Sequence, residues 1–311
     1  MANYEIKDGV GIIPESAKKI ESCAFKGCTN LTSVVIPEGV TEIGNSAFEG
    51  CTNLTSVVIP EGVTRIEYAA FKGCTALTSV VISEGVTEIR SDAFRGCTGL
   101  TSVVIPESVT KIGCSPFYGC TGLTSIAVAP GNKVYDSREG CNAIINTLTR
   151  NLIQGCTTTK LPEGLRCLGN YSFAGFTNLA NINSLLEGVQ SIGESAFAGC
   201  TGLTNLTLPE SVMFVCTRAF YGCTGLESVV IQNAIADLDS YRTYLFADCS
   251  NLRSVTLPAG IKKIDKSTFS GCDNLNTINV PAKKADYYKK RLPEKLHQFI
   301  VELAPVKKAK K

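Results

Sequence analysis

One phrase of 23 residues returns in register along most of the chain. It begins AFKGCTNLTSVVIPEGVTEI at Ala24, near-copies begin at Ala47, Ala70 and Ala93, and a looser copy begins at Pro116. A fixed period of this length is the signature of a repeat solenoid. One position of the unit is held by nine cysteines and one phenylalanine, namely Cys28, Cys51, Cys74, Cys97, Cys120, Phe176, Cys200, Cys223, Cys249 and Cys272. We therefore expect one elongated domain of about ten coils over residues 1–281.

The LxxVxI pattern inside each unit predicts a strand with one buried face. In the first unit, Leu31, Val34 and Ile36 fall on one side, because strand side chains alternate. Pro37 ends this strand and a Glu-Gly turn follows it. An isolated unit buries too little apolar surface to offset the entropy of ordering 23 residues. Stability must therefore come from stacking each coil on its neighbours.

The phrase AFxGCxxLxxVxIPxxVTxIG resembles the BspA-like group of leucine-rich repeats, over about Gly11 to Pro281. The resemblance implies a leucine-rich-repeat solenoid, a right-handed coil with a parallel β-sheet face, mainly β with little helix. It also implies bacterial or protist proteins, often at a cell surface, that bind rather than catalyse. The group has no shared catalytic residues.

Two segments depart from the repeat. The first is an insertion near residues 130–164, in which residues 143–146 and 151–153 flank the turn sequence TLTR and predict a hairpin. Tyr135, Asp136, Arg138 and Glu139 are candidate recognition residues there, and the alternative is a structural excursion that bends the stack.

The second departure is residues 282–311, which predict a C-terminal cap and a basic tail. AKKADYYKKRLP predicts a short helix that Pro293 stops, and KLHQFIVEL predicts a final strand or short helix. The side chains expected to cover the last coil are Tyr287, Leu292, Leu296, Phe299 and Val301.

The chain has fifteen cysteines, and we expect free thiols rather than a disulfide framework, with the nine at the shared repeat position forming an inward column. Adjacent coils place equivalent Cβ vectors side by side, which is poor disulfide geometry. Cys141 and Cys156 flank the hairpin strands and are the one pair that we consider for a disulfide. The start MANYEIKDGV lacks the basic and apolar regions of a leader. We therefore expect a cytoplasmic chain as written, and a surface or secreted one if a native leader was removed.

Charge is concentrated at the end of the chain. The net charge is +2, yet residues 281–311 hold ten Lys and Arg against three acids. Contact of this tail with nucleic acid or an anionic surface is one interpretation, and a solvated end is the other. Two charged columns follow the period, an acidic one at Glu15, Glu38, Glu61, Glu84 and Glu107 and an alternating one at Lys19, Glu42, Arg65, Glu88 and Lys111. One carboxylate per coil is too few for a calcium site, so we expect no metal.

No set of residues suggests catalysis or a cofactor. His297 is the only histidine, and the glycines of the GC and EG pairs belong to turns rather than to a phosphate loop. We expect a protein that is not an enzyme and that takes no small-molecule substrate. Its partner should be another protein rather than nucleic acid, and no segment is apolar enough to cross a membrane.

The candidate binding residues are the outward side chains of the LTSVVI strand, which stacking aligns in two columns. The alternative is that the valines reflect strand propensity alone and pack only on each other. Recognition of glycans or host matrix is the alternative function, and the absence of aromatic residues from these columns disfavours glycans. The predicted binding residues are Ser33, Val35, Ser56, Val58, Ser79, Val81, Ser102 and Val104, with Tyr135 and Arg138 of the insertion.

Overall fold

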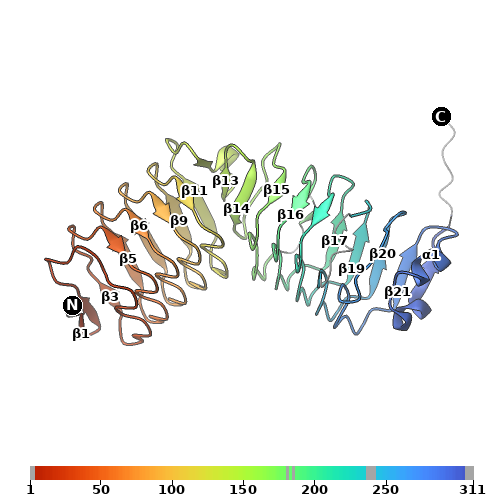
Figure 1. Ribbon diagram of the computed structural model, residues 1–311, viewed down its shortest axis with the longest axis horizontal. Coiled ribbons are helices and arrows are strands. Elements are labelled where there is room, and N and C mark those ends of the chain that lie inside the picture. The colour runs from red at the N-terminus through yellow and green to blue at the C-terminus, as the bar shows by residue number, and fades with distance from the viewer. Residues whose placement is uncertain (1–3, 180–181, 184–185, 236–242, 305–311) are drawn as a thin grey trace. The chain divides into compact units, whose positions relative to one another are not determined.

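Each repeat unit forms one coil of a β-solenoid, with its strand beside the equivalent strand of the next coil (Figure 1). The computed structural model describes residues 4–179, 182–183, 186–235 and 243–304. The chain divides into two compact units, an N-terminal unit (Met1–Pro162) and a C-terminal unit (Glu163–Lys311). The boundary falls inside the predicted insertion, and one domain over residues 1–281 stays a prediction.

In the N-terminal unit, the LTSVVI segment of each coil contributes a short strand to one side of the solenoid. Parallel ladders join β5 to β7 and β9 to β11, with Ser56 opposite Ser79 and Ser102 opposite Ser125. Residues that are one sequence period apart therefore lie opposite each other in these ladders. The strands are β3 (Ser33–Val34), β5 (Ser56–Ile59), β7 (Ser79–Ile82), β9 (Ser102–Ile105) and β11 (Ser125–Val128).

The GVTEI segment of each coil builds a second wall. Its two-residue strands form one parallel sheet in the order of the coils, with Ile43 opposite Ile66 and Ile66 opposite Ile89. The strands are β4 (Glu42–Ile43), β6 (Arg65–Ile66), β8 (Glu88–Ile89) and β10 (Lys111–Ile112).

The N-terminal unit begins with a cap that the repeat does not encode. Strand β1 (Glu5–Lys7) pairs antiparallel with β2 (Val10–Ile12), and β2 pairs parallel with β3. Tyr4 packs edge-on against Phe25 with 5.4 Å between ring centroids. Its hydroxyl oxygen accepts a hydrogen bond of 2.9 Å from the Glu21 backbone N–H. This tyrosine therefore covers the open end of the first coil.

The insertion forms the predicted hairpin. Strand β12 (Tyr135–Asp136) and a short 3₁₀ turn, η1 (Arg138–Gly140), lead into β13 (Ala143–Asn146) and β14 (Asn151–Gly155). The last two strands pair antiparallel, with an irregular register between Ile144 and Ile145. An antiparallel excursion thus interrupts the parallel stack.

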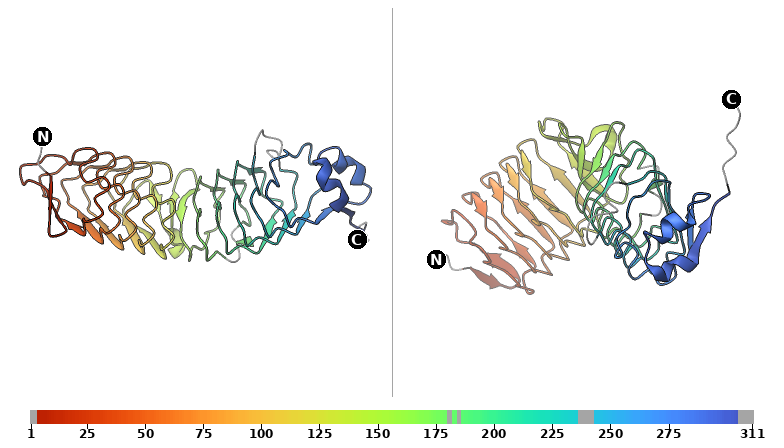
Figure 2. Two further views of the ribbon diagram at one scale, coloured as in Figure 1. Left: turned by 90° about the horizontal axis from the view of Figure 1, so that it is seen from below. Right: turned by 45° about the vertical axis from the view of Figure 1, so that its right-hand side comes forward.

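The C-terminal unit repeats the two-walled pattern (Figure 2). The ladders among its described strands are parallel, and Asn205 lies opposite Ser228 as the period requires. One wall holds β15 (Cys167–Leu168), β16 (Ser191–Ile192) and β18 (Phe214–Val215). The other holds β17 (Asn205–Leu208), β19 (Ser228–Ile231), β20 (Ser254–Thr256), β21 (Thr277–Val280) and β22 (Ile300–Glu302).

The C-terminal cap matches the expected elements but buries different side chains. It consists of α1 (Ala285–Lys289) and the 3₁₀ helix η4 (Glu294–Phe299), followed by β22. Leu292 and Leu296 are buried as expected. Tyr288 is fully buried, whereas we expected Tyr287 to be the tyrosine that covers the last coil. Val301 is exposed, because β22 pairs parallel with β21 and places it beside the outward Asn279.

Stacked phenylalanine rings form the centre of each unit. In the N-terminal unit, Phe48 and Phe71 lie 5.0 Å apart with an interplanar angle of 3°, and Phe94 continues the stack at 5.3 Å. In the C-terminal unit, Phe197 and Phe220 stack at 5.3 Å. The rings lie nearly parallel because successive coils place the same side chain at the same position, and centroid distances of this size fall within the range of offset-stacked aromatic pairs.

The repeated cysteines are buried thiols beside this stack, which confirms the predicted inward column from Cys51 onward in the N-terminal unit. Each thiol donates to the carbonyl oxygen of a phenylalanine in the preceding coil. The Sγ–O distance is 3.0 Å from Cys51 to Phe25 and 3.1 Å from Cys74 to Phe48. Cysteine suits this position because it is small and apolar and carries a weak S–H donor.

Burial keeps these thiols protonated. It raises the pKa of Cys51 and of Cys200 to about 12, since a thiolate would lose its hydration there. Cys141 and Cys156 are also buried free thiols. The Cys141 sulfur lies 3.9 Å from Ala143 O, and the Cys156 sulfur lies 3.4 Å from both Asn142 O and Thr158 Oγ1.

We expect Phe71→Ala to lower the free energy of unfolding by about 3–5 kcal/mol, because it removes a ring stacked on both faces and leaves a cavity. Tyr68→Ala is the control, because this ring is exposed. Denaturant unfolding of both variants is the measurement. Equal losses would show that the phenylalanine stack is not the core.

The raised thiol pKa values predict that stability falls at alkaline pH. A thiol that titrates near 8.5 when unfolded and near 12 when folded stabilises the fold fully below pH 8.5. Above that pH, the free energy of unfolding falls by about 1.4 kcal/mol per pH unit for each such thiol. Guanidinium unfolding under reductant at neutral and alkaline pH measures this slope. The Cys51→Ala and Cys200→Ala variants should each flatten it, and an unchanged slope would contradict the assignment.

Candidate functional site

The outward valines are exposed, as the alternation predicted. Exposure of these side chains ranges from 54% for Val81 to 72% for Val35, whereas Val57 and Val103 are buried. A valine with more than half of its surface exposed is not buried by its column neighbours. Both interpretations of these valines, a binding surface and strand propensity alone, therefore stay open for the four coils from β3 to β9.

A column of serines runs beside the valines. Ser56, Ser79 and Ser102 are exposed, and Ser33 is half-buried. Within the part of the chain that the structure describes, the hydroxyls of these four serines have no hydrogen-bond partner. They are donors and acceptors that a bound molecule would satisfy. We call these two columns the Ser/Val face, comprising Ser33, Ser56, Ser79, Ser102, Val35, Val58, Val81 and Val104.

A ladder of threonines borders the Ser/Val face and satisfies its own hydroxyls. Each Oγ1 donates to the carbonyl oxygen of the threonine one coil earlier, as Thr55 does to Thr32 at 3.2 Å and Thr78 to Thr55 at 3.1 Å. Thr101 and Thr124 continue the ladder at 3.3 Å each. These bonds tie one coil to the next at the edge of the face.

The opposite border is acidic. Glu38, Glu61, Glu84 and Glu107 are exposed at the turns that follow the strands. The Glu84 carboxylate accepts hydrogen bonds from the backbone N–H groups of Glu107 and Ser108, at 3.3 and 3.2 Å. The surface between the threonine ladder and this border carries only serine and valine, so it is an uncharged strip.

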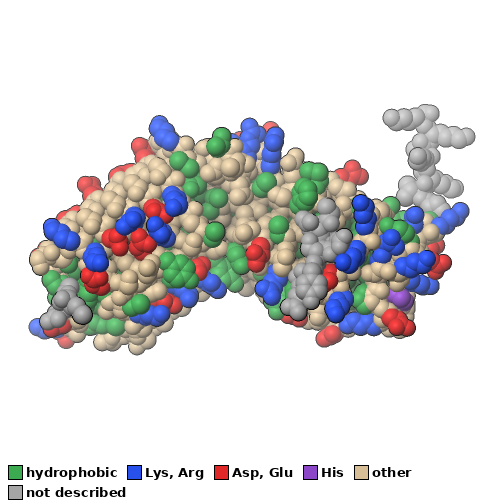
Figure 3. Space-filling view, viewed as in Figure 1, with side chains coloured by type: hydrophobic (Ala, Val, Ile, Leu, Met, Phe, Trp, Pro, Cys, Tyr) green, Lys and Arg blue, Asp and Glu red, His purple; other side chains and the backbone are tan. Residues whose placement is uncertain are grey.

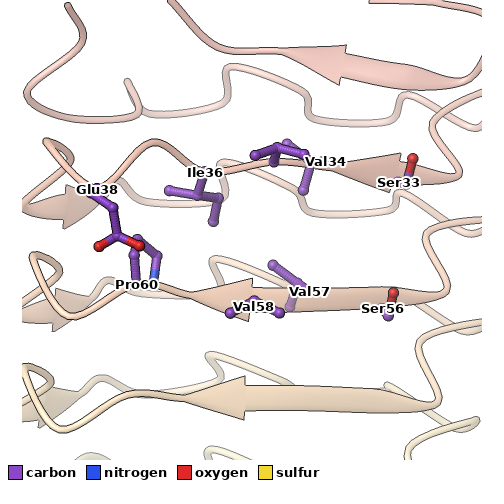
Figure 4. Close-up of a pocket in the computed structure, with 9 residues that line it drawn as sticks. Ser33, Val34, Ile36, Glu38, Ser56, Val57, Val58 and Pro60 are labelled. Atoms are coloured by element: carbon purple, nitrogen blue, oxygen red, sulfur yellow. The ribbon is translucent and has the colours of Figure 1, made fainter. Parts of the chain in front are cut away.

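A groove opens in the Ser/Val face between β3 and β5 (Figure 4). These two strands belong to separate ladders, so backbone pairing does not close the space between them. The groove has a volume of about 290 Å³. Its walls are mainly aliphatic, with two hydroxyls and one carboxylate, from Ser33, Val34, Val35, Ile36, Glu38, Ser56, Val57, Val58 and Pro60.

Tyr135 is not an exposed recognition residue, and this part of the prediction is wrong. Its ring is buried, and its hydroxyl oxygen accepts a hydrogen bond of 2.9 Å from the Ile112 backbone N–H. Burial raises the pKa of this phenol. The tyrosine anchors the insertion to the preceding coil, which favours the structural interpretation of this residue.

Arg138 is occupied within the insertion. Its Nε donates to both carboxylate oxygens of Asp136 at 3.0 Å, and the paired carboxylate raises the pKa of the guanidinium. Leu148, which the sequence reasoning did not single out, is 89% exposed at the hairpin tip. An apolar residue inside the TLTR turn was the available signal.

Charges on the second wall are paired with each other. Arg65 bonds Glu42 at 2.5 Å and Lys111 bonds Glu88 at 2.9 Å, as the alternating column predicted. Lys19 departs from the column and pairs with Glu21 at 3.2 Å.

A carboxylate on a neighbouring turn is paired in the same way. Lys26 and Lys72 both form ion pairs with Glu49. The Lys26 ammonium is the main reason that the pKa of Glu49 falls to about 2. These groups stabilise one another and form no reactive site.

Within the described residues, no three or more His, Cys, Asp and Glu side chains gather as a metal site would require. Over the same ranges, no helix has the length and apolarity needed to span a bilayer.

A family model for the BspA type leucine rich repeat region matches residues 10–128, 146–241 and 167–290 in six copies. The chain therefore belongs to the BspA-type leucine-rich repeat family. This confirms the predicted fold class of a repeat solenoid with parallel strands and little helix.

Solved structures share this fold. The chain is similar to the pneumococcal vaccine antigen PcpA, with a TM-score of 0.70 and 23% identity over 86% of this chain and 67% of that one. It is also similar to a leucine-rich repeat protein from Eubacterium ventriosum, with a TM-score of 0.59 and 25% identity over 88% and 87%. A leucine rich cell surface protein from Faecalibacterium prausnitzii gives a TM-score of 0.56 and 24% identity over 89% and 80%. No curated protein matches the sequence.

Replacing Tyr135 by Phe should lower the free energy of unfolding by about 1–3 kcal/mol, because the Ile112 N–H loses its buried acceptor. Leu148→Ser, at the exposed hairpin tip, should change stability by less than about 0.5 kcal/mol. Thermal and denaturant unfolding measure both. The assignment of an anchoring role fails if the tyrosine variant is as stable as the parent chain.

Proposed function

We propose that the Ser/Val face binds another protein and that the chain is a non-enzymatic scaffold or adhesin-type module. The observation that carries this proposal is the run of four exposed valines in successive coils. At a strand spacing of about 4.8 Å, the run extends for roughly 15 Å. Contiguous exposed apolar surface marks interaction sites, and solenoids bind along such faces.

The chemistry of the face favours a protein partner over a glycan. Valine offers apolar contact and the serine column offers unpaired hydroxyls, whereas a sugar ring is held best on an aromatic face. The Ser/Val face consists of valine and serine alone, so it offers no aromatic ring on which a sugar could stack. The groove between β3 and β5 suits one aliphatic or aromatic side chain of the partner, with Ser33 and Ser56 beside it.

Two further observations support a binding rather than a catalytic role. The column thiols are buried and protonated, so they lack the thiolate character of a nucleophile. The ring of His297 lies in the C-terminal cap with Nε2 at 3.0 Å from the Leu292 carbonyl oxygen.

We also propose that the protein acts at a cell surface or after secretion. The printed names of two similar structures, a vaccine antigen and a cell surface protein, support this location. The exposed binding face suits the same setting, because a surface module meets partners from outside the cell.

The test replaces Val58 and Val81 together with lysine. We expect the free energy of unfolding to stay within about 1 kcal/mol, because both side chains are exposed. Capture of the partner protein should be lost, because two ammonium groups would be desolvated at the interface. The measurement compares proteins cross-linked by the parent chain and by the variant, with bands identified by mass spectrometry.

The matched control carries Tyr68→Lys and Leu148→Lys, two exposed apolar residues away from the Ser/Val face. It should capture the same proteins as the parent chain. If the valine variant keeps full capture, the face is not the binding site. If it unfolds, the valines belong to the core.

A further inference from the structure

We propose that the C-terminal cap, taken here together with the last coil on which it packs, is a second interaction surface that docks on an anionic phospholipid bilayer. The proposal concerns residues 258–304 of the C-terminal unit and is independent of the Ser/Val face. It rests on the density of cations on the cap, on their arrangement around one aromatic ring, and on the exposed aliphatic residues beside them.

Cations outnumber acids on this cap. Residues 258–304 hold nine Lys and Arg and five Asp and Glu, a net charge of +4. Figure 3 shows the Lys and Arg side chains gathered over this end of the C-terminal unit. All nine are exposed except the half-buried Arg291, and they are Lys262, Lys263, Lys266, Lys283, Lys284, Lys289, Lys290, Arg291 and Lys295.

Two of these cations lie over the Tyr287 ring. The Arg291 guanidinium carbon lies 3.5 Å from the ring centroid and the Lys284 ammonium lies 5.2 Å from it. The Nε of Arg291 donates to the Lys262 carbonyl oxygen at 2.8 Å, and the Tyr287 hydroxyl donates to the Ile261 carbonyl oxygen at 3.0 Å. The ring quadrupole offsets part of the repulsion between the cations without cancelling their charge.

Two of the five acids on the cap have partners at α1. The Glu302 carboxylate accepts a hydrogen bond of 2.8 Å from the Ala285 backbone N–H, which lowers its pKa and fixes it at the start of α1. Asp286 pairs with Lys289 at 3.7 Å, an exposed and weak contact. In the sequence, Lys307, Lys308, Lys310 and Lys311 follow, beyond the described residues.

Exposed aliphatic residues adjoin the cations. Val301 is 49% exposed and Leu303 is 42% exposed. The bond from Ala285 to Glu302 places them close to Lys283 and Lys284 at the start of α1. A bilayer uses both features, because lysines attract lipid phosphates and aliphatic side chains enter the headgroup boundary. A nucleic acid would use the charge alone, and for this reason we favour the bilayer.

The experiment measures co-sedimentation of the whole chain with vesicles of phosphatidylcholine alone and of phosphatidylcholine mixed with phosphatidylserine. We expect binding to the mixed vesicles only, weakened when salt rises from about 50 to about 200 mM. The test variant carries Lys262→Glu, Lys290→Glu and Lys295→Glu. It should bind about 100-fold more weakly, since each lysine near an anionic surface contributes roughly a fivefold factor.

The control makes the same charge change in the N-terminal unit, with Lys7→Glu, Lys18→Glu and Lys133→Glu, all exposed positions. Its affinity for the mixed vesicles should fall by less than about threefold, because its charges lie outside the cap. The glutamine versions of the cap substitutions serve as the test if circular dichroism shows that the glutamate variant is unfolded.

A second variant separates a bilayer from a general polyanion. Val301→Ser with Leu303→Ser should weaken vesicle binding and leave binding to duplex DNA unchanged. The Val58→Lys, Val81→Lys variant should bind vesicles at least as well as the parent chain. Equal losses for the cap and control charge variants, equal binding to uncharged vesicles, or capture of DNA without capture of vesicles would each overturn the proposal.

Discussion

The structure depends on hydrogen bonds that join each coil to the next at the spacing of the repeat. Phe48 N–H donates to the Ala70 carbonyl at 2.7 Å, and Phe71 N–H donates to Ala93 at the same distance. A buried N–H group needs such a partner, and here its partner lies in the next coil. No coil is therefore complete alone, which is the physical reason for nearest-neighbour stability in repeat proteins.

The same register produces the exposed surface. Inward positions repeat as stacked rings and thiols, so outward positions must repeat as the Ser/Val face. The face has little charge because each repeat places its charged side chains at the turns and on the second wall, where Arg65 and Glu42 pair. The exposed Ser/Val face thus follows from the phase of the repeat. The basic cap differs, because its cations lie outside the period and a repeated coil does not explain them.

Sequence periodicity predicted what is periodic in the structure. The inward Val34, the outward Val35 and the antiparallel hairpin all follow from local alternation and turn chemistry. The misses are contacts that the period does not encode. Tyr135 is buried because its hydroxyl meets the Ile112 N–H, and Tyr288 rather than Tyr287 is buried because the phase of a five-residue helix is set by packing. The groove beside Val58 reflects a missing ladder between two coils with nearly the same sequence.

The central claim is that successive coils are joined directly by backbone hydrogen bonds in the register of the repeat. Scalar couplings across hydrogen bonds, measured by NMR on the isotope-labelled chain, test it most directly. The structure predicts a coupling between the Phe71 amide nitrogen and the Ala93 carbonyl carbon, and another between Phe48 and Ala70. A coupling from either amide to a carbonyl of its own coil would contradict the stacked register and the Ser/Val face with it.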